Sequence, residues 1–196
     1  MASHTPSLSA AIWPAESRNA VILRNVLLAV FGVALLTLSA KIKVPMYPVP
    51  VTLQPMVVLG IGAAFGFRLG VATLLLYVIE GAMGLPVFAN TPEMGVGIPY
   101  LMGPTGGFIF GFVLAAGAVG WLAEKGWDRN ALSMMIACLI GLALIYIPGI
   151  LQLGSIIGFD KAIAGGFYPF ILGDLIKAAI IALGFPAVWS LLRRPM

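Results

Sequence analysis

Residues 168–181 read Tyr-Pro-Phe-Ile-Leu-Gly-Asp-Leu-Ile-Lys-Ala-Ala-Ile-Ile, and the apolar run that they begin continues to Leu192. Asp174 and Lys177 are the charged residues of this run. On insertion scales, an acidic or basic side chain at the centre of a membrane-spanning helix costs about 2.5–3.5 kcal/mol. A separation of i, i+3 places both side chains on one helix face, where they can neutralise each other. The stretch therefore predicts a transmembrane helix whose polar face turns into the protein interior.

The pair Asp174 and Lys177 has two interpretations. As a plain ion pair, it would only stabilise its own helix. As a ligand-binding pair, it would offer one acceptor and one donor to a polar group inside the helix bundle. Charged residues within membrane segments usually face such an interior and serve a functional site. We favour the ligand-binding interpretation.

The composition of the chain is that of an integral membrane protein. Of its 196 residues, 61% are hydrophobic and 9% are charged, whereas soluble domains carry about 25% charged residues. The net charge of +4 is not gathered in a basic cluster interleaved with aromatic residues, so nucleic acid is not an expected partner. The single cysteine, Cys138, lies in an apolar run and is expected to be a buried small hydrophobe.

Apolar segments separated by glycine, proline and charged residues predict six transmembrane helices. Their continuous hydrophobicity favours helices over a β-barrel, because each helix satisfies its own backbone in lipid. We expect an all-α bundle forming one domain, residues 20–192, after a short cytoplasmic tail, residues 1–19, without a signal peptide. A tight turn is expected at 66–68. The segments cover residues 20–40, 51–67, 69–83, 104–123, 131–153 and 167–192.

The distribution of basic residues predicts the orientation. Seven would lie on the side of the N-terminus and three on the other, with Lys177 inside the membrane. The positive-inside rule then places both termini in the cytoplasm. The long loops, 41–50, 84–103 and 154–166, face outside, where we expect recognition to occur. The inner residues are Arg18, Arg24, Arg68, Lys125, Arg129, Arg193 and Arg194, and the outer ones are Lys41, Lys43 and Lys161.

Polar residues at the outer ends of the segments are candidate ligand contacts. Val-Pro-Val-Thr-Leu-Gln at 49–54 supplies Thr52 and Gln54, which could equally cap or bond a neighbouring helix. Gly-Leu-Pro-Val-Phe-Ala-Asn at 84–90 supplies Asn90, which could also simply form a turn. In both motifs the structural and the ligand-binding interpretations remain open.

Gly-Pro-Thr-Gly-Gly at 103–107 is expected to begin the fourth helix, with Pro104 in its first position. The free N–H groups at such a helix start could attract an anion. The favoured interpretation is close helix packing through small residues.

Residue usage argues against an enzyme or a metal site. The histidine of this chain is His4 alone, in the polar tail, which excludes a Ser-His pair, a Cys-His pair and a multi-histidine metal site. Asp174 has no second carboxylate beside it within the apolar segments, so an aspartyl-type intramembrane enzyme is poorly supported. We therefore expect no catalytic residue, no metal and no cofactor.

Four motifs in order, at 49–54, 84–89, 103–107 and Gly-Asp-Leu-Ile-Lys at 173–177, resemble those of the BioY family. Its members are the biotin-binding S components of energy-coupling factor (ECF) vitamin transporters. The resemblance covers residues 20–192 and implies a six-helix, high-affinity substrate-binding subunit with biotin as its ligand. It also implies partners in the cytoplasmic membrane of a prokaryote: a transmembrane coupling subunit and ATPase subunits. The family's ligand-contacting Asp and Lys correspond to Asp174 and Lys177.

The chemistry of biotin fits this assignment. Asp174 can accept from the two N–H groups of the ureido ring, and Lys177 can donate to its carbonyl oxygen, while aromatic residues such as Tyr47, Phe88 and Tyr100 can form apolar walls. The backbone at 105–107, Lys41 or Lys43 are candidates for the biotin carboxylate. The expected ligand-binding set is Thr52, Gln54, Asn90, Tyr100, Asp174 and Lys177.

Other functions and states remain open from sequence alone. The subunit could bind another vitamin, or the pair could act as acid and base in a membrane-embedded enzyme. A homo-oligomeric channel is disfavoured because a self-neutralising pair does not make a ring of one charge.

Membrane lipid is an expected partner, and the oligomeric state is not decided. The first helix contains Ala29, Gly32 and Ala34 but no Ala-x-x-x-Ala, the motif through which S components typically dock.

Overall fold

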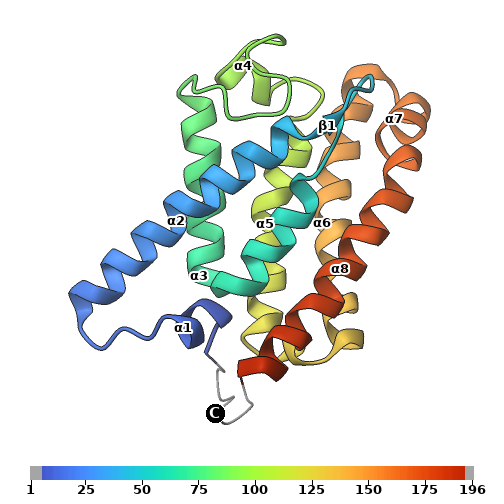
Figure 1. Ribbon diagram of the computed structural model, residues 1–196. Coiled ribbons are helices and arrows are strands. Elements are labelled where there is room, and N and C mark those ends of the chain that lie inside the picture. Colours follow the sequence, from blue (N-terminus) through green and yellow to red (C-terminus); the bar gives the residue numbers. More distant parts are fainter. Residues whose placement is uncertain (1–5, 193–196) are drawn as a thin grey trace.

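The computed structural model describes residues 6–192 and consists mainly of long helices lying side by side (Figure 1). Five of them, α2, α3, α5, α6 and α8, are long and apolar enough to cross a membrane. The elements are α1 (Leu8–Ile12), α2 (Arg18–Lys41), β1 (Lys43–Val44), β2 (Val51–Thr52), α3 (Gln54–Ala82), α4 (Ile98–Leu101), α5 (Gly106–Ala123), η1 (Trp127–Arg129), α6 (Ala131–Ile157), α7 (Phe159–Gly166) and α8 (Tyr168–Leu192). His4, Arg193 and Arg194 lie outside the described residues.

Helix α3 is broken into two arms at Gly66. This residue has φ +77° and ψ −176°, a backbone conformation essentially restricted to glycine. The arms run in different directions from this point (Figure 1). The N–H of Phe67 donates to Glu124 Oε1 at 3.0 Å, so a carboxylate lies at the positive N-terminal end of the second arm. The tight turn predicted at 66–68 is confirmed, within a single helix that covers both predicted segments.

Several predicted boundaries were wrong. Val51 and Thr52 do not open a helix but pair with Val44 and Lys43 in a short antiparallel hairpin, and α3 begins at Gln54. Helix α5 begins at Gly106 rather than Pro104. Residues 154–166, predicted as a loop, are almost wholly helical, because Gly158 at φ +88° ends α6 and α7 follows directly.

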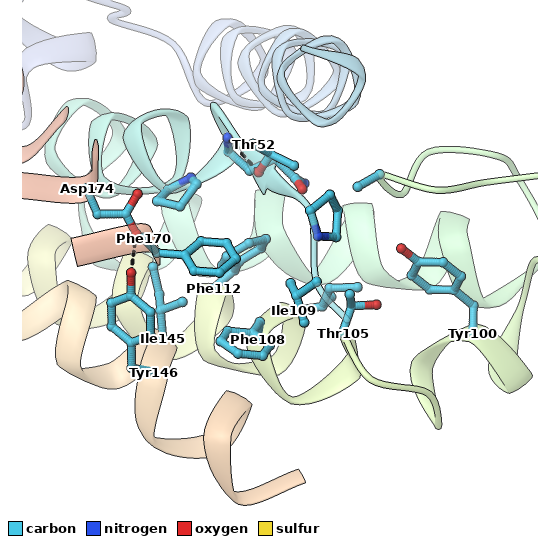
Figure 2. A pocket seen from close by; sticks show the side chains of 15 residues that line it. Thr52, Tyr100, Thr105, Phe108, Ile109, Phe112, Ile145, Tyr146, Phe170 and Asp174 are labelled. Carbon is cyan, nitrogen blue, oxygen red and sulfur yellow. Dashed lines mark hydrogen bonds between the residues drawn. The ribbon is translucent and has the colours of Figure 1, made fainter. Parts of the chain in front are cut away.

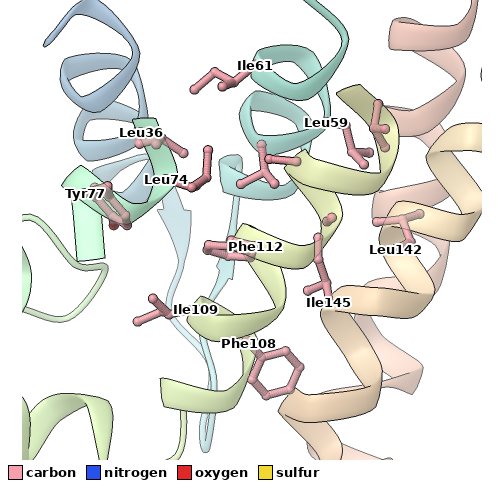
Figure 3. Close-up of a cluster of buried hydrophobic side chains, with 14 of the residues drawn as sticks. Leu36, Leu59, Ile61, Leu74, Tyr77, Phe108, Ile109, Phe112, Leu142 and Ile145 are labelled. Carbon is pink, nitrogen blue, oxygen red and sulfur yellow. The ribbon is translucent and has the colours of Figure 1, made fainter. Parts of the chain in front are cut away.

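Close approach through glycines places α5 at the centre of the bundle. A Cβ added to Gly120 would lie 2.5 Å from the carbonyl carbon of Gly66, and one on Gly111 would lie 2.7 Å from Cα of Ile145. The backbones of α3, α5 and α6 therefore pack without intervening side chains. Phe112, Leu59 and other apolar residues fill the remaining space (Figure 3).

The motif at 103–107 serves this packing. Gly106 and Gly107 are buried, and a Cβ on either would collide with the carbonyl oxygen of Leu101 or Pro148 respectively. The N–H of Gly106 is bonded to the carbonyl oxygen of Gly103. The packing interpretation of this motif is confirmed. Cys138 is also buried, as expected.

Two lysines attach the 84–97 loop to the end of α2. Lys41 Nζ donates to the carbonyl oxygens of Phe88 and Thr91 at 2.9 and 2.8 Å. Lys43 Nζ donates to the carbonyl oxygen of Ala89 at 2.9 Å and to Asn90 Oδ1 at 2.7 Å. Both ammonium groups, which were candidates for a ligand carboxylate, are therefore bonded to oxygens of the loop.

We expect Gly66→Ala to lower the stability of the protein by about 1–3 kcal/mol, because alanine is strained at this φ and ψ. Its Cβ would also meet the Glu124 carboxylate. Thermal unfolding in detergent measures the change. Gly184→Ala in α8 is the control, since a Cβ there meets nothing within 4 Å. Equal melting temperatures for the two variants would contradict the strain at Gly66.

Removing an ammonium group should loosen the loop. In Lys41→Met the bonds to Phe88 and Thr91 are lost. Hydrogen bonds to charged groups contribute about 1.5–3 kcal/mol each, so hydrogen exchange of amides 87–94 should accelerate by at least about tenfold. Lys161→Met on α7 is the control, because Lys161 is exposed. Unchanged exchange in Lys41→Met would show that the loop is held by other contacts.

Candidate functional site

An elongated cavity lies between the first arm of α3, α5, α6 and α8, with the loop before α5 at one end. It encloses about 510 Å³ between side chains, including the part that opens to the outside. Figure 2 shows Asp174 and Tyr146 at one end and Tyr100 at the other, with Phe108, Phe112 and Phe170 between them. The cavity is therefore apolar along its length and polar at its two ends.

The polar end on α8 is a buried ion pair with two further partners. Lys177 Nζ lies 2.7 Å from Asp174 Oδ1, and the hydroxyl of Tyr146 donates to Asp174 Oδ2 at 2.6 Å. Lys177 Nζ also donates to the carbonyl oxygen of Thr52 at 2.6 Å. Asp174 and Lys177 are 2% and 9% exposed. Since each charge is hydrogen-bonded as well as paired, the cost of burying it is offset locally.

The structure brings most of the predicted site residues together. Thr52, Gln54, Tyr100 and Asp174 line the same cavity. Lys177 does not line it but bonds to both Asp174 and Thr52 at its wall. These residues come from segments as far apart in the sequence as 52 and 177.

Asn90 lies just beyond this cavity. It borders a smaller space that also touches Tyr100 and Thr105, two residues of the main cavity. Its side-chain oxygen accepts from Lys43, and its N–H points to the Tyr100 hydroxyl at 3.4 Å. Asn90 therefore lies beyond the end of the cavity that carries Tyr100 and Thr105.

Two of the three proposed aromatic wall residues do not line the cavity. Phe88 is 1% exposed and stacks on Tyr100, with a centroid distance of 5.2 Å, but is not part of the cavity lining. Tyr47 is 80% exposed in the hairpin. Tyr100 does line the cavity, while Phe108, Phe112 and Phe170, which were not predicted, supply the other aromatic surface.

A hydrogen-bonded chain connects the cavity to the loop. Gln54 Nε2 donates to the Tyr77 hydroxyl at 2.8 Å, which donates to the carbonyl oxygen of Val87 at 3.0 Å. Of the two interpretations left open for Gln54, the structure shows the bond from a buried amide to a neighbouring helix, here between the two arms of α3. Gln54 thus lines the cavity and also fixes the start of the 84–97 loop.

Tyr146 is the main site residue that the sequence reasoning missed. It projects from α6 and packs edge-to-face against Phe108 and Phe167. Its position in the sequence could have indicated this role, because a tyrosine hydroxyl deep in an apolar segment needs a hydrogen-bond partner. Among residues 6–192 there is no group of three His, Cys, Asp or Glu that could hold a metal ion.

Comparisons with known proteins agree with this architecture. A biotin transporter BioY from Thermotoga maritima is 40% identical over 163 residues, which cover 82% of this chain and 93% of that protein. A probable biotin transporter BioY from Pyrococcus horikoshii is 40% identical over 156 residues, covering 80% and 90%. These relatives and the five apolar helices identify a multi-pass membrane protein.

The fold matches a solved structure described as the S-component for biotin from an ECF-type ABC transporter. The TM-score is 0.75 at 22% identity, covering 90% of this chain and 95% of that one. The sequence model of the BioY family matches residues 10–194. The resemblance carried by the four motifs is thereby confirmed: this chain belongs to the BioY family.

Proposed function

We propose that this chain binds biotin with high affinity and takes part in its uptake as the substrate-binding subunit of an ECF-type transporter. The observation that carries the proposal is the buried Asp174–Lys177 pair at the polar end of an apolar cavity, in a member of the BioY family. Curated relatives that share 40% of their residues with this chain are named biotin transporters or probable biotin transporters. No catalytic step is required of the site.

The donors and acceptors at the α8 end suit the ureido ring of biotin. An ionised carboxylate can accept about four hydrogen bonds, so Asp174 retains capacity beyond Lys177 and Tyr146 for ring N–H groups. Lys177 has three N–H donors, of which two are bonded to Asp174 and Thr52. The third would serve the ring carbonyl oxygen once the ammonium group turns from the wall toward the cavity.

The rest of the cavity suits the rest of the molecule. The cavity is lined mainly by apolar and aromatic side chains with a few polar groups at its ends, as ligand sites usually are. Phe108, Phe112 and Phe170 would pack on the thioether ring and the hydrocarbon chain. The carboxylate would then extend toward Tyr100 and Asn90, where the Lys43 ammonium group lies 2.7 Å from Asn90 Oδ1.

The proposed subunit sits in the cytoplasmic membrane of a prokaryote with both termini inside. The two arms of α3 would cross the membrane separately, because Gly66 turns the chain between them, which gives six crossings from five apolar helices. The cavity end that carries Tyr100 and Asn90 would face outside. Because the sequence has no nucleotide-binding motif, a coupling subunit and ATPase subunits would supply the energy.

We expect Asp174→Asn and Lys177→Met each to weaken biotin binding by about 10- to 150-fold, the loss of one hydrogen bond to a charged group. Calorimetry on the detergent-purified protein, with thiamine and riboflavin as alternative ligands, measures this. Asp160→Asn and Lys161→Met are matched controls, since these exposed residues of α7 undergo the same chemical changes. Binding of another vitamin instead of biotin would refute the ligand assignment.

A double variant with Asn at 174 and Met at 177 separates binding from stability. Removing one charge leaves the other buried and unpaired, whereas removing both often restores stability. The double variant should therefore recover part of its melting temperature and none of its biotin affinity. Affinity within about threefold of wild type in both single variants would defeat the site assignment.

The proposed topology is tested by cysteine labelling of intact cells in a Cys138→Ser background. Lys161→Cys and Glu93→Cys should react with a membrane-impermeant reagent, whereas Arg68→Cys and Lys125→Cys should react only after permeabilisation. These positions are exposed in the structure, so a failure to label reports on the membrane side. If Arg68→Cys and Glu93→Cys label from the same side, the second arm of α3 does not cross the membrane.

A further inference from the structure

A second hollow lies at the opposite end of the bundle and is lined by residues from the start of α1, from α2, from α3 and by Glu124 after α5. Figure 1 shows α1 at this end of the bundle. It encloses about 740 Å³, including the part that is open to the outside. One wall is apolar and is formed by α3, with Phe65 and Leu69. The polar side chains that line it are Ser7, Ser9, Arg24, Asn25, Arg68 and Glu124. We call this hollow the arginine groove.

The charged side chains of the arginine groove favour an anion. Neither Arg24 nor Arg68 forms an ion pair with a carboxylate among residues 6–192. Within the described part of the chain, Arg24 donates to neutral oxygens, those of Trp13 at 2.9 Å and of Asn25 at 3.2 and 3.3 Å. Glu124 is the acid in the lining, and its Oε1 accepts from the N–H of Phe67. The cationic side chains of this lining are therefore two guanidinium groups, Arg24 and Arg68, without a carboxylate partner in residues 6–192.

The surroundings favour an amphipathic anion over a soluble one. Trp13 and Ile12, next to the groove, are 47% and 58% exposed, and exposed tryptophans of membrane proteins concentrate at the headgroup level. On α2, Leu23 and Leu27 are 60% and 47% exposed. This helix is itself long and apolar enough to span a bilayer. The groove thus lies where polar headgroups meet acyl chains.

We propose that the arginine groove binds the phosphodiester group of an anionic phospholipid from the leaflet on the side of the N-terminus. A phosphodiester carries one negative charge, and arginine is well suited to bidentate contact with its oxygens. The hydroxyls of Ser7 and Ser9 and the amide of Asn25 face the rest of the headgroup. The acyl chains lie along Phe65, Leu69 and Ala72. Basic pockets between membrane helices bind acidic lipid headgroups on the same principle.

Native mass spectrometry of the full chain in neutral detergent tests the proposal. Phosphatidylglycerol and phosphatidylcholine with identical acyl chains are the lipid probes, and inorganic phosphate is the soluble competitor. We expect phosphatidylglycerol to bind preferentially. Arg68→Gln should weaken its binding by about fivefold, the effect of one basic residue near an anionic surface, and Arg68→Lys should retain most of it. Arg24→Gln should have a similar effect on binding.

The matched control is Arg18→Gln. Arg18 lies near Arg24 at the start of α2 and carries the same charge, but it does not line the groove. It should leave phosphatidylglycerol binding unchanged. Melting temperatures separate loss of binding from loss of fold, and Arg68 makes no hydrogen bond to a described residue, so Arg68→Gln is expected to fold normally. Equal binding of the two lipids, equal effects of Arg18→Gln and Arg68→Gln, or displacement of the lipid by millimolar phosphate would each overturn the proposal.

Discussion

The salt bridge between Asp174 and Lys177 is the interaction on which the rest of the site depends. An unpaired charge at this depth would be expensive, so the two residues require each other and also require their neighbours. The Tyr146 hydroxyl binds the carboxylate from α6, and the carbonyl oxygen of Thr52 binds the ammonium group from the hairpin before α3. One pair of charges therefore fixes the relative positions of three separate parts of the chain at the inner end of the cavity.

The cavity exists because the helices around it approach closely elsewhere. Glycines 62, 111 and 120 bring the α5 backbone against α3 and α6 on one side of the bundle. Near the cavity, large side chains such as Phe108, Phe112 and Phe170 hold the same helices apart. Small and large residues follow one another along α5: Gly111 packs against the backbone of α6, while Phe108 and Phe112 on either side of it line the cavity. These close backbone contacts lie next to the cavity and hold its aromatic walls in place.

The features that could be predicted from the sequence are those that depend on one segment of the chain alone. The cost of charge in lipid identified Asp174 and Lys177, and the combination of glycine and arginine at 66–68 identified the turn within α3. Tyr146 was missed because its partner lies 28 residues away, and a single segment does not show which face of α6 meets α8. Residues 154–166 were taken for a loop because their glycines resemble a break, whereas tertiary packing keeps them helical on both sides of Gly158.

The bonds from Lys41 and Lys43 to the loop make a mechanical linkage. Lys41 at the end of α2 and Lys43 in β1 bond to oxygens of residues 88–91, while Ala89 and Tyr100 of the same connection line the cavity. Only 17% of the most apolar part of α2 is buried, so this helix is the outermost part of the bundle together with α8. A rigid-body tilt of α2 would pull on the roof of the cavity through two ammonium groups. The position of α2 and the position of the cavity roof are therefore linked by the hydrogen bonds of these two lysines.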